Sequence, residues 1–218
     1  AEALHERELT IKRATLGAEH PEVGGALYDL GIARMKQQKL TLALSSLQSA
    51  VQILELDSSG HRETLGKALL FVGEVLRAQA SSQGSEDART AKLTDAMNHL
   101  RRAHVVLEEE CGTESQLVGA AFGYISDAAR ELGRFDDALK AGERALAIQE
   151  QVLGSEHAEV GTTHGCLGEV LSQQGRLEDA ARHFARAVVI SEKARGPGAS
   201  EVVLWSRKWA KGLFTTAI

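Results

Sequence analysis

The feature that most constrains this 218-residue sequence is a spacing that returns along its whole length. Related apolar residues recur at intervals of 42, 53, 42 and 42 positions, at Val23, Leu65, Val118, Val160 and Val202. Eight positions after each of them, a column of small residues keeps the same intervals, at Gly31, Gly73, Ser126, Gly168 and Ala210. Periods of roughly 20–50 residues are typical of folds in which one short unit stacks on the next. The spacing therefore predicts a repeat array.

Each unit of the array reads as two helices joined by a tight turn. In residues 153–194, apolar residues return every three or four positions on both sides of the turn sequence QQGRL, a period that indicates two amphipathic helices. Small residues mark the expected crossing points, at Gly31 and Ala43 and at Gly168 and Ala180, because helix axes approach to about 8–10 Å only over small side chains. The chain has only two prolines. We expect an all-α solenoid of stacked antiparallel hairpins with about ten helices.

The repeat columns also predict where the helices lie in a single array over residues 1–218. We call the first helix of each hairpin a first-type helix and the second a second-type helix. The expected units are a lone second-type helix at 1–16, repeats at 22–56, 62–110, 116–152 and 158–194, and a terminal capping helix at 199–216. Within the repeats, the helices are expected at 22–37, 40–56, 62–79, 89–110, 116–132, 135–152, 158–174 and 177–194. The single interval of 53 places an insertion near 80–91, either as a loop or as a lengthening of both flanking helices.

These residues resemble the tetratricopeptide repeat. The pattern that carries the resemblance is L-x-x-L-G followed by Ala, a large apolar residue and Ala, and it reads Leu27, Leu30, Gly31, Ala43, Leu47, Ala50 and His164, Leu167, Gly168, Ala180, Phe184, Ala187. The 42-residue period, the joint LGAEHPEV at 16–23 and the helix end ALAIQEQVLG at 145–154 resemble the kinesin light chain subclass. The Asn pair of that subclass is absent, since the matching pairs here are Tyr28-Asp29, Leu70-Phe71, Gly123-Tyr124 and Gly165-Cys166.

The resemblance implies a right-handed superhelix whose first-type helices line a concave groove that binds a peptide or helix of a partner protein. By the family's pattern, the groove-facing residues are Tyr28, Asp29, Ile32, Met35, Leu70, Phe71, Glu74, Arg77, Tyr124, Asp127, Arg130, Thr162, Cys166, Glu169, Arg207, Lys208 and Lys211. Among them, Tyr28, Leu70, Phe71 and Tyr124 form either an apolar strip for the partner or wedges of the core. The basic residues of the last helix, Arg207, Lys208 and Lys211, either bind an acidic end of the ligand or are simply solvated.

Trp205 and Trp209 lie four positions apart, and therefore on one face of the terminal helix. That face is expected to pack on the helix at 177–194. The alternative is that part of this face is exposed and contacts either a further repeat or a second copy of the chain. Contact with a second copy would make the protein a homodimer.

Composition excludes several function classes. The net charge of −5 is spread over mixed acids and bases, so we expect no nucleic-acid partner. No stretch is apolar for long enough to insert into a membrane. Cys111 and Cys166 have no partners at metal-binding or disulfide spacing, which favours a reducing compartment such as the cytoplasm. The chain starts without Met or a leader, so we expect a longer parent protein from which a targeting signal is missing.

No residues are arranged for catalysis. His164 and Cys166 are about 200° apart around a helix and cannot form a nucleophile and base pair. His20 and His157 recur at helix starts, which favours a structural role over metal ligation. We predict no enzyme activity, metal or cofactor. The expected function is a scaffold for protein–protein interaction; the alternatives are a self-associating scaffold and a regulatory repeat domain of a larger multidomain protein.

Overall fold

A computed structural model of the chain describes residues 2–57 and 60–215, with side chains up to residue 210. Within these ranges the chain forms ten helices and no strand, which confirms the all-α class. The helices are α1 (Glu2–Leu16), α2 (Pro21–Lys36), α3 (Leu40–Glu55), α4 (Arg62–Ala80), α5 (Glu86–Cys111), α6 (Gln116–Glu131), α7 (Phe135–Leu153), α8 (Ala158–Gln173), α9 (Leu177–Arg195) and α10 (Ser200–Thr215). The sequence predicted each of them to within three residues at either end.

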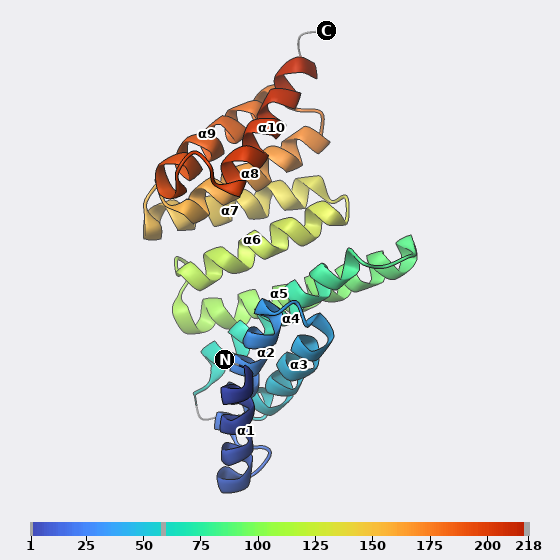
Figure 1. Cartoon of the computed structure of the whole chain (residues 1–218), viewed down its shortest axis with the longest axis vertical. Helices are drawn as coiled ribbons and strands as arrows, with labels where there is room; N and C mark the ends of the chain where they lie inside the picture. The colour runs from blue at the N-terminus through green and yellow to red at the C-terminus, as the bar shows by residue number, and fades with distance from the viewer. Residues whose placement is uncertain (1, 58–59, 216–218) are drawn as a thin grey trace. The chain divides into compact units, whose positions relative to one another are not determined.

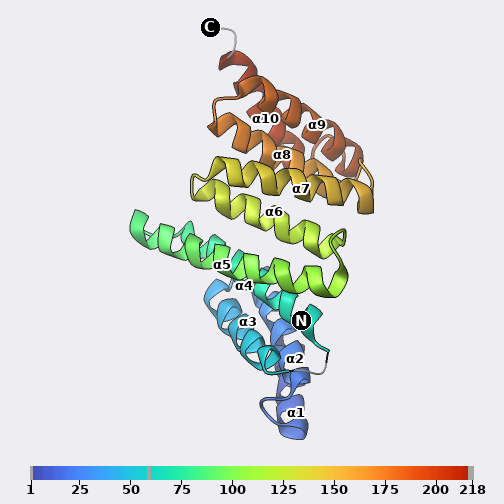
Figure 2. The same cartoon turned by 180° about the vertical axis from the view of Figure 1, so that it is seen from behind.

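The chain divides into two compact units, residues 1–113 and 114–218. In unit 1, consecutive helices from α1 to α5 pack on one another, and the first-type helices α2 and α4 also touch. In unit 2, consecutive helices from α6 to α10 do the same, and α8 contacts both α6 and α10 (Figures 1 and 2). Each unit is thus a stack of antiparallel hairpins. The single array over 1–218 stays a prediction.

The column of small residues lies where paired helices come closest. A Cβ atom added at Gly31 or Gly73 would lie 2.6 Å from Cγ of Leu47 or of Leu100, on the partner helix of the same hairpin. Both leucines are fully buried. The expected role of this column in close helix packing is therefore confirmed.

The insertion near 80–91 lengthens both helices of its hairpin. Helix α4 continues to Ala80, and α5 already begins at Glu86, three residues before the predicted start. Ser85 begins this helix because its side chain accepts a hydrogen bond from the backbone N–H of Ala88. Figure 1 shows this end of the α4–α5 hairpin projecting beyond α2 and α3. Of the two expected forms of the insertion, the helical extension is the one observed.

The two joint histidines cap helices. Nδ1 of His20 accepts from the backbone N–H of Glu22 at 3.2 Å, and Nδ1 of His157 accepts from that of Glu159 at the same distance. Each satisfies one of the N–H groups that a helix start leaves without a partner. The predicted structural role of these residues is confirmed.

Candidate functional site

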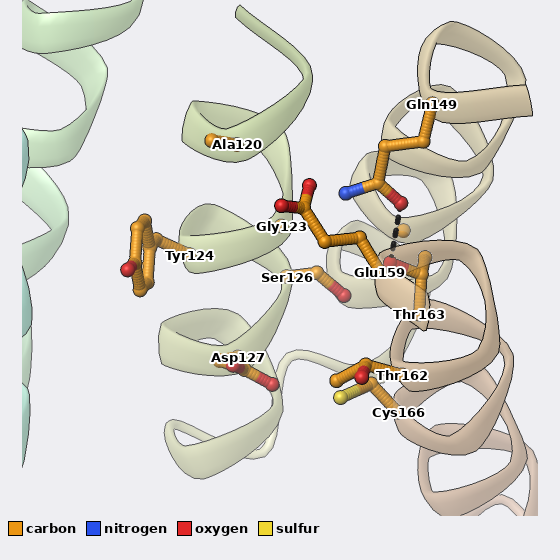
Figure 3. Close-up of a pocket in the computed structure, with 11 residues that line it drawn as sticks. Ala120, Gly123, Tyr124, Ser126, Asp127, Gln149, Glu159, Thr162, Thr163 and Cys166 are labelled. Atoms are coloured by element: carbon orange, nitrogen blue, oxygen red, sulfur yellow. Dashed lines mark hydrogen bonds between the residues drawn. The ribbon is translucent and has the colours of Figure 1, made fainter. Parts of the chain in front are cut away.

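Unit 2 contains a pocket of about 320 Å³ between its first-type helices α6 and α8 (Figure 3). Helix α7 closes it from behind. The lining residues are Ala120, Gly123, Tyr124, Ser126, Asp127, Gly142, Gln149, Glu159, Thr162, Thr163 and Cys166. This volume lies at the lower end of the range typical of ligand sites.

Small residues keep the pocket open. A Cβ atom added at Gly123 would meet no atom within 4 Å, so the space above this part of α6 is empty. Opposite it, α8 contributes the short side chain of Thr163. Ser126 closes one edge, and its hydroxyl hydrogen is engaged, because it donates to the backbone oxygen of Ala138 at 2.7 Å.

The floor of the pocket carries an amide donor. Gln149 of α7 is only 6% exposed, and its side-chain oxygen accepts from the hydroxyl of Thr163 at 2.6 Å. In Figure 3 the amide nitrogen of Gln149 points into the space between α6 and α8. That nitrogen donates to no residue in the described part of the chain. Since an amide nitrogen can donate two hydrogen bonds, a ligand oxygen in the pocket can accept from it.

Two carboxylates flank the opening, and the lining contains no lysine or arginine. Asp127 points from α6 toward Cys166, and Glu159 reaches across from α8 (Figure 3). Burial, together with the charges of Asp127 and Glu169, raises the pKa of the Cys166 thiol. It therefore stays protonated at neutral pH and is a poor nucleophile, and what this pocket can do chemically is bind.

Ion pairs run from the pocket across the three first-type helices of unit 2. Arg130 lies 3.9 Å from Asp127 and 3.5 Å from Glu169, and Glu169 also pairs with Lys208 of α10. Lys208 is therefore already engaged within the chain. Arg207 is exposed, and the side chain of Lys211 lies outside the described residues. An acidic ligand end at these bases stays a prediction.

The junction between α8 and α10 is closed by an indole ring. Trp205 is 5% exposed and stacks on Phe184 of α9, with ring centroids 6.1 Å apart. It also covers Gly165 of α8, where an added Cβ would overlap the ring. The predicted packing of Trp205 on the helix at 177–194 is confirmed. Trp209 remains 36% exposed.

In unit 1, the predicted groove residues gather around one aromatic pair. The half-buried rings of Tyr28 and Phe71 lie 6.1 Å apart. The predicted set needs one correction: Leu70 is 2% exposed and belongs to the core, so it offers no surface to a partner. Leu70 is the last of three consecutive buried residues, 68–70, so α4 is buried over a wide arc at this point.

The other predicted residues of unit 1 differ in their exposure. Glu74 pairs with Arg77 at 2.8 Å, Ile32 and Met35 are half-buried, and Asp29 is exposed. Partial burial nevertheless raises the pKa of Asp29. Tyr124 belongs to unit 2, where its ring points away from α8 (Figure 3). The continuous strip from Tyr28 to Tyr124 stays a prediction.

The predicted groove set lacks seven of the eleven lining residues, among them the polar residues Gln149, Glu159 and Thr163. Gln149 lies on a second-type helix, and the family pattern assigns the groove to first-type helices only. The detectable signal was the pair of glycines at 123 and 165, which leaves a space for the next first-type helix to fill.

A histidine pair in the same unit was also missed. Nδ1 of His164 and Nδ1 of His183 lie 3.0 Å apart across α8 and α9. Burial lowers the pKa of both rings, and the neighbouring His183 and Arg186 help to lower that of His164 to about 4. Among the described residues, no cluster of three or more potential metal ligands accompanies the pair.

The comparisons with known proteins agree with this architecture. Residues 117–193, which span most of α6 to α9, match the family described as tetratricopeptide repeat. No match was found among curated protein sequences. None of the helices in the described ranges combines the length and apolar character needed to cross a lipid bilayer.

Solved structures with the same fold share little sequence with this chain. BtubC (BKLC) from P. vanneervenii has a TM-score of 0.78 at 15% identity, over 99% of this chain and 83% of BtubC. A putative kinesin light chain with nearly identical TPR-like repeats from Podosopora anserina has a TM-score of 0.70 at 15% identity, over 91% and 89%. Aspartyl phosphate phosphatase F from Bacillus subtilis has a TM-score of 0.70 at 14% identity, over 88% and 46%, so this chain spans about half its length.

The fold defines a class, the helical repeat proteins built from stacked antiparallel hairpins. Within that class, residues 117–193 match the tetratricopeptide repeat family, and the kinesin-light-chain-like structures share the fold. Proteins with this repeat fold typically serve as scaffolds for protein–protein interaction and are not themselves catalysts.

Proposed function

We propose that this chain is a non-catalytic interaction module and that unit 2 binds a segment of a partner protein in the pocket between α6 and α8. The observation that carries the proposal is the pocket itself, about 320 Å³ in volume and held open by Gly123. The unpartnered amide of Gln149 supports a peptide as occupant, since peptide carbonyl groups are strong acceptors.

Filling the pocket tests this proposal. In Gly123→Leu, the new side chain enters empty space, so the fold is kept while the volume for a ligand is lost. The matched control is Gly25→Leu in α2, where an added Cβ also meets nothing within 4 Å and which does not line this pocket. A library of displayed peptides should yield sequences that bind the wild type and Gly25→Leu but not Gly123→Leu. If no peptide shows this dependence on Gly123, the proposal is wrong.

A second candidate function is self-association through α10. It is favoured by the exposed Trp209, together with the exposed neighbours Val203 and Leu204 on the same helix. Light scattering after size exclusion tests it: a dimer that Trp209→Ala converts to monomer supports this candidate, and a wild-type monomer at high concentration rejects it.

The setting proposed for either function is the cytoplasm, within a larger multidomain protein that the module regulates. The two thiols, Cys111 and Cys166, form no disulfide and support the reducing compartment.

A further inference from the structure

The repeat register relates the open pocket of unit 2 to the closed junction that follows it. A shift of 42 residues carries Gly123 onto Gly165 and Thr163 onto Trp205. The same shift carries Asp127 onto Glu169 and Cys166 onto Lys208. The junction between α8 and α10 therefore shows which side chains fill the space between first-type helices when the chain itself provides them.

At the closed junction, α10 supplies an aromatic ring and a cation three residues apart. The ring of Trp205 lies over Gly165. The ammonium group of Lys208 lies 5.7 Å from the centroid of that ring and pairs with Glu169. Ring, cation and carboxylate thus form one cluster, in which the cation of Lys208 contacts both the face of the ring and the acid.

The junction between α6 and α8 has the glycine and the carboxylate of this arrangement but lacks its ring and its cation. Gly123 leaves the same space for a ring, and Asp127 places a carboxylate where Glu169 stands. The positions that would supply the ring and the cation are Thr163 and Cys166, which are both too short to do so. The pocket therefore corresponds to the space that Trp205 and Lys208 occupy in the next repeat, and the chain leaves it unfilled.

We propose that the partner segment is a helix that inserts an aromatic side chain over Gly123 and places a lysine or arginine, three residues further on, against Asp127. This inference rests on the proposed function and adds the chemistry of the ligand. Residues three apart lie on one helix face, as Trp205 and Lys208 do. A cavity of roughly 150 Å³ already holds a benzene ring, so the volume of about 320 Å³ accommodates the aromatic group.

Charge at the opening favours a basic segment. Asp127 and Glu159 are the charged residues of the lining, and both are acidic. Glu159 is exposed, and its carboxylate makes no hydrogen bond or ion pair with the residues that the structure describes. Arg130, 3.9 Å from Asp127, divides its charge among Asp127, Glu131 and Glu169. One arginine among these acids leaves negative charge for a ligand cation to neutralise.

The test uses the full chain and a synthetic alanine-rich helical peptide that carries Trp and Lys three positions apart. Two control peptides replace Trp by Ala or Lys by norleucine. Calorimetry should show binding of the first peptide and roughly tenfold weaker binding of each control. Glu159→Gln should weaken the Trp–Lys peptide about threefold and Asp127→Asn about tenfold, whereas the exposed Glu150→Gln of α7 should not change its affinity.

A graft from the closed junction supplies a second, independent readout. Cys166→Lys puts an ammonium group where Lys208 stands in the next repeat, next to Asp127. In this variant, the peptides with Lys and with norleucine should bind equally well, because the chain now provides the cation. Equal affinity of these two peptides for the wild type, or no binding of the Trp–Lys peptide, overturns the inference.

The display experiment separates this inference from the function on which it rests. Peptides that depend on Gly123 but lack an aromatic and basic pair leave the proposed function standing and reject the ligand chemistry. If no peptide depends on Gly123, both are rejected. Peptides that depend on Gly123 and share such a pair support both.

Discussion

Unit 2 contains two junctions between first-type helices that are built on the same register and differ in one respect. Between α8 and α10, Trp205 fills the space over a glycine and is stacked on Phe184. Between α6 and α8, the equivalent glycine faces a threonine, and a pocket remains. The difference teaches that a glycine in this column has no fixed role. Whether it marks packed core or an open site depends on the side chain that the next helix brings.

The largest expected effect is the loss of the ring at the closed junction. Trp205→Ala should lower the free energy of unfolding by about 3–5 kcal/mol, because it leaves a cavity among Phe184, Leu171 and Ala187. Urea unfolding measures the change. Trp209→Ala is the control on the same helix, and a loss of similar size there would show that the two tryptophans do not differ in packing.

The two glycines should respond oppositely to the same substitution. Gly165→Ala should cost about 1–3 kcal/mol, because the new methyl group overlaps the buried indole. Gly123→Ala should be neutral or stabilise by up to about 1 kcal/mol, since the methyl enters empty space and alanine favours the helix. Thermal melting of the two variants checks this contrast. Equal melting temperatures would erase the distinction between the open and the closed junction.

Acid should weaken the hairpin that carries the closed junction. Where α8 and α9 place His164 and His183, the register of α6 and α7 places Phe122 and Ala141. The folded state holds the pKa of His164 at about 4, below its ordinary value of 6.5, so the unfolded state binds more protons between these pH values. Stability is therefore complete above pH 6.5 and falls as the pH drops toward 4.

We expect this loss to reach about 1–2 kcal/mol, less than the full pKa shift implies, because the rings are only half-buried. Urea unfolding across the pH range measures it. The double substitution His164→Phe and His183→Ala copies the neighbouring hairpin and should reduce the slope between pH 4 and 6.5, to which His99, whose pKa burial also lowers, contributes as well. A slope that survives unchanged would mean that other groups cause it.

The smallest expected effect concerns the ion pair over the ring. Lys208→Met should cost about 0.5–1 kcal/mol at low salt and less at high salt, because the pair with Glu169 is partly exposed and screened. Cys166→Met at the open junction is the control, and its effect should not depend on salt. Unfolding at two salt concentrations makes the comparison, and a salt-independent effect of Lys208→Met would show that the charge contributes nothing there.

Much of the fold could be read from the sequence because repeats impose strict columns. Gly31 and Gly73 recur where helices cross, and the N-cap histidines recur at the joints. The candidate site was less accessible. Gln149 takes part only because its side chain extends from α7 between two other helices to meet Thr163. The period of apolar residues along α7 does not indicate where the side-chain amide of Gln149 lies, so the family pattern left the residue out.

Tertiary structure also decided questions that the sequence had left open. The pattern placed Lys208 among the bases available to a ligand, and the structure pairs it with Glu169. The pattern placed Leu70 in the groove, and the structure buries it. Both residues lie on first-type helices as expected. A period fixes on which helix a residue lies, whereas its partner depends on the rotation of that helix against its neighbours.

The sequence by itself determined the hairpins, their number and the positions at which small residues recur, because these follow from local helix propensity and a constant period. Only the tertiary structure decided that the space at Gly165 is filled and the space at Gly123 is open. The physical reason is that a cavity belongs to several helices at once. It exists where the side chains that converge from α6, α7 and α8 are together too small to fill the volume between them.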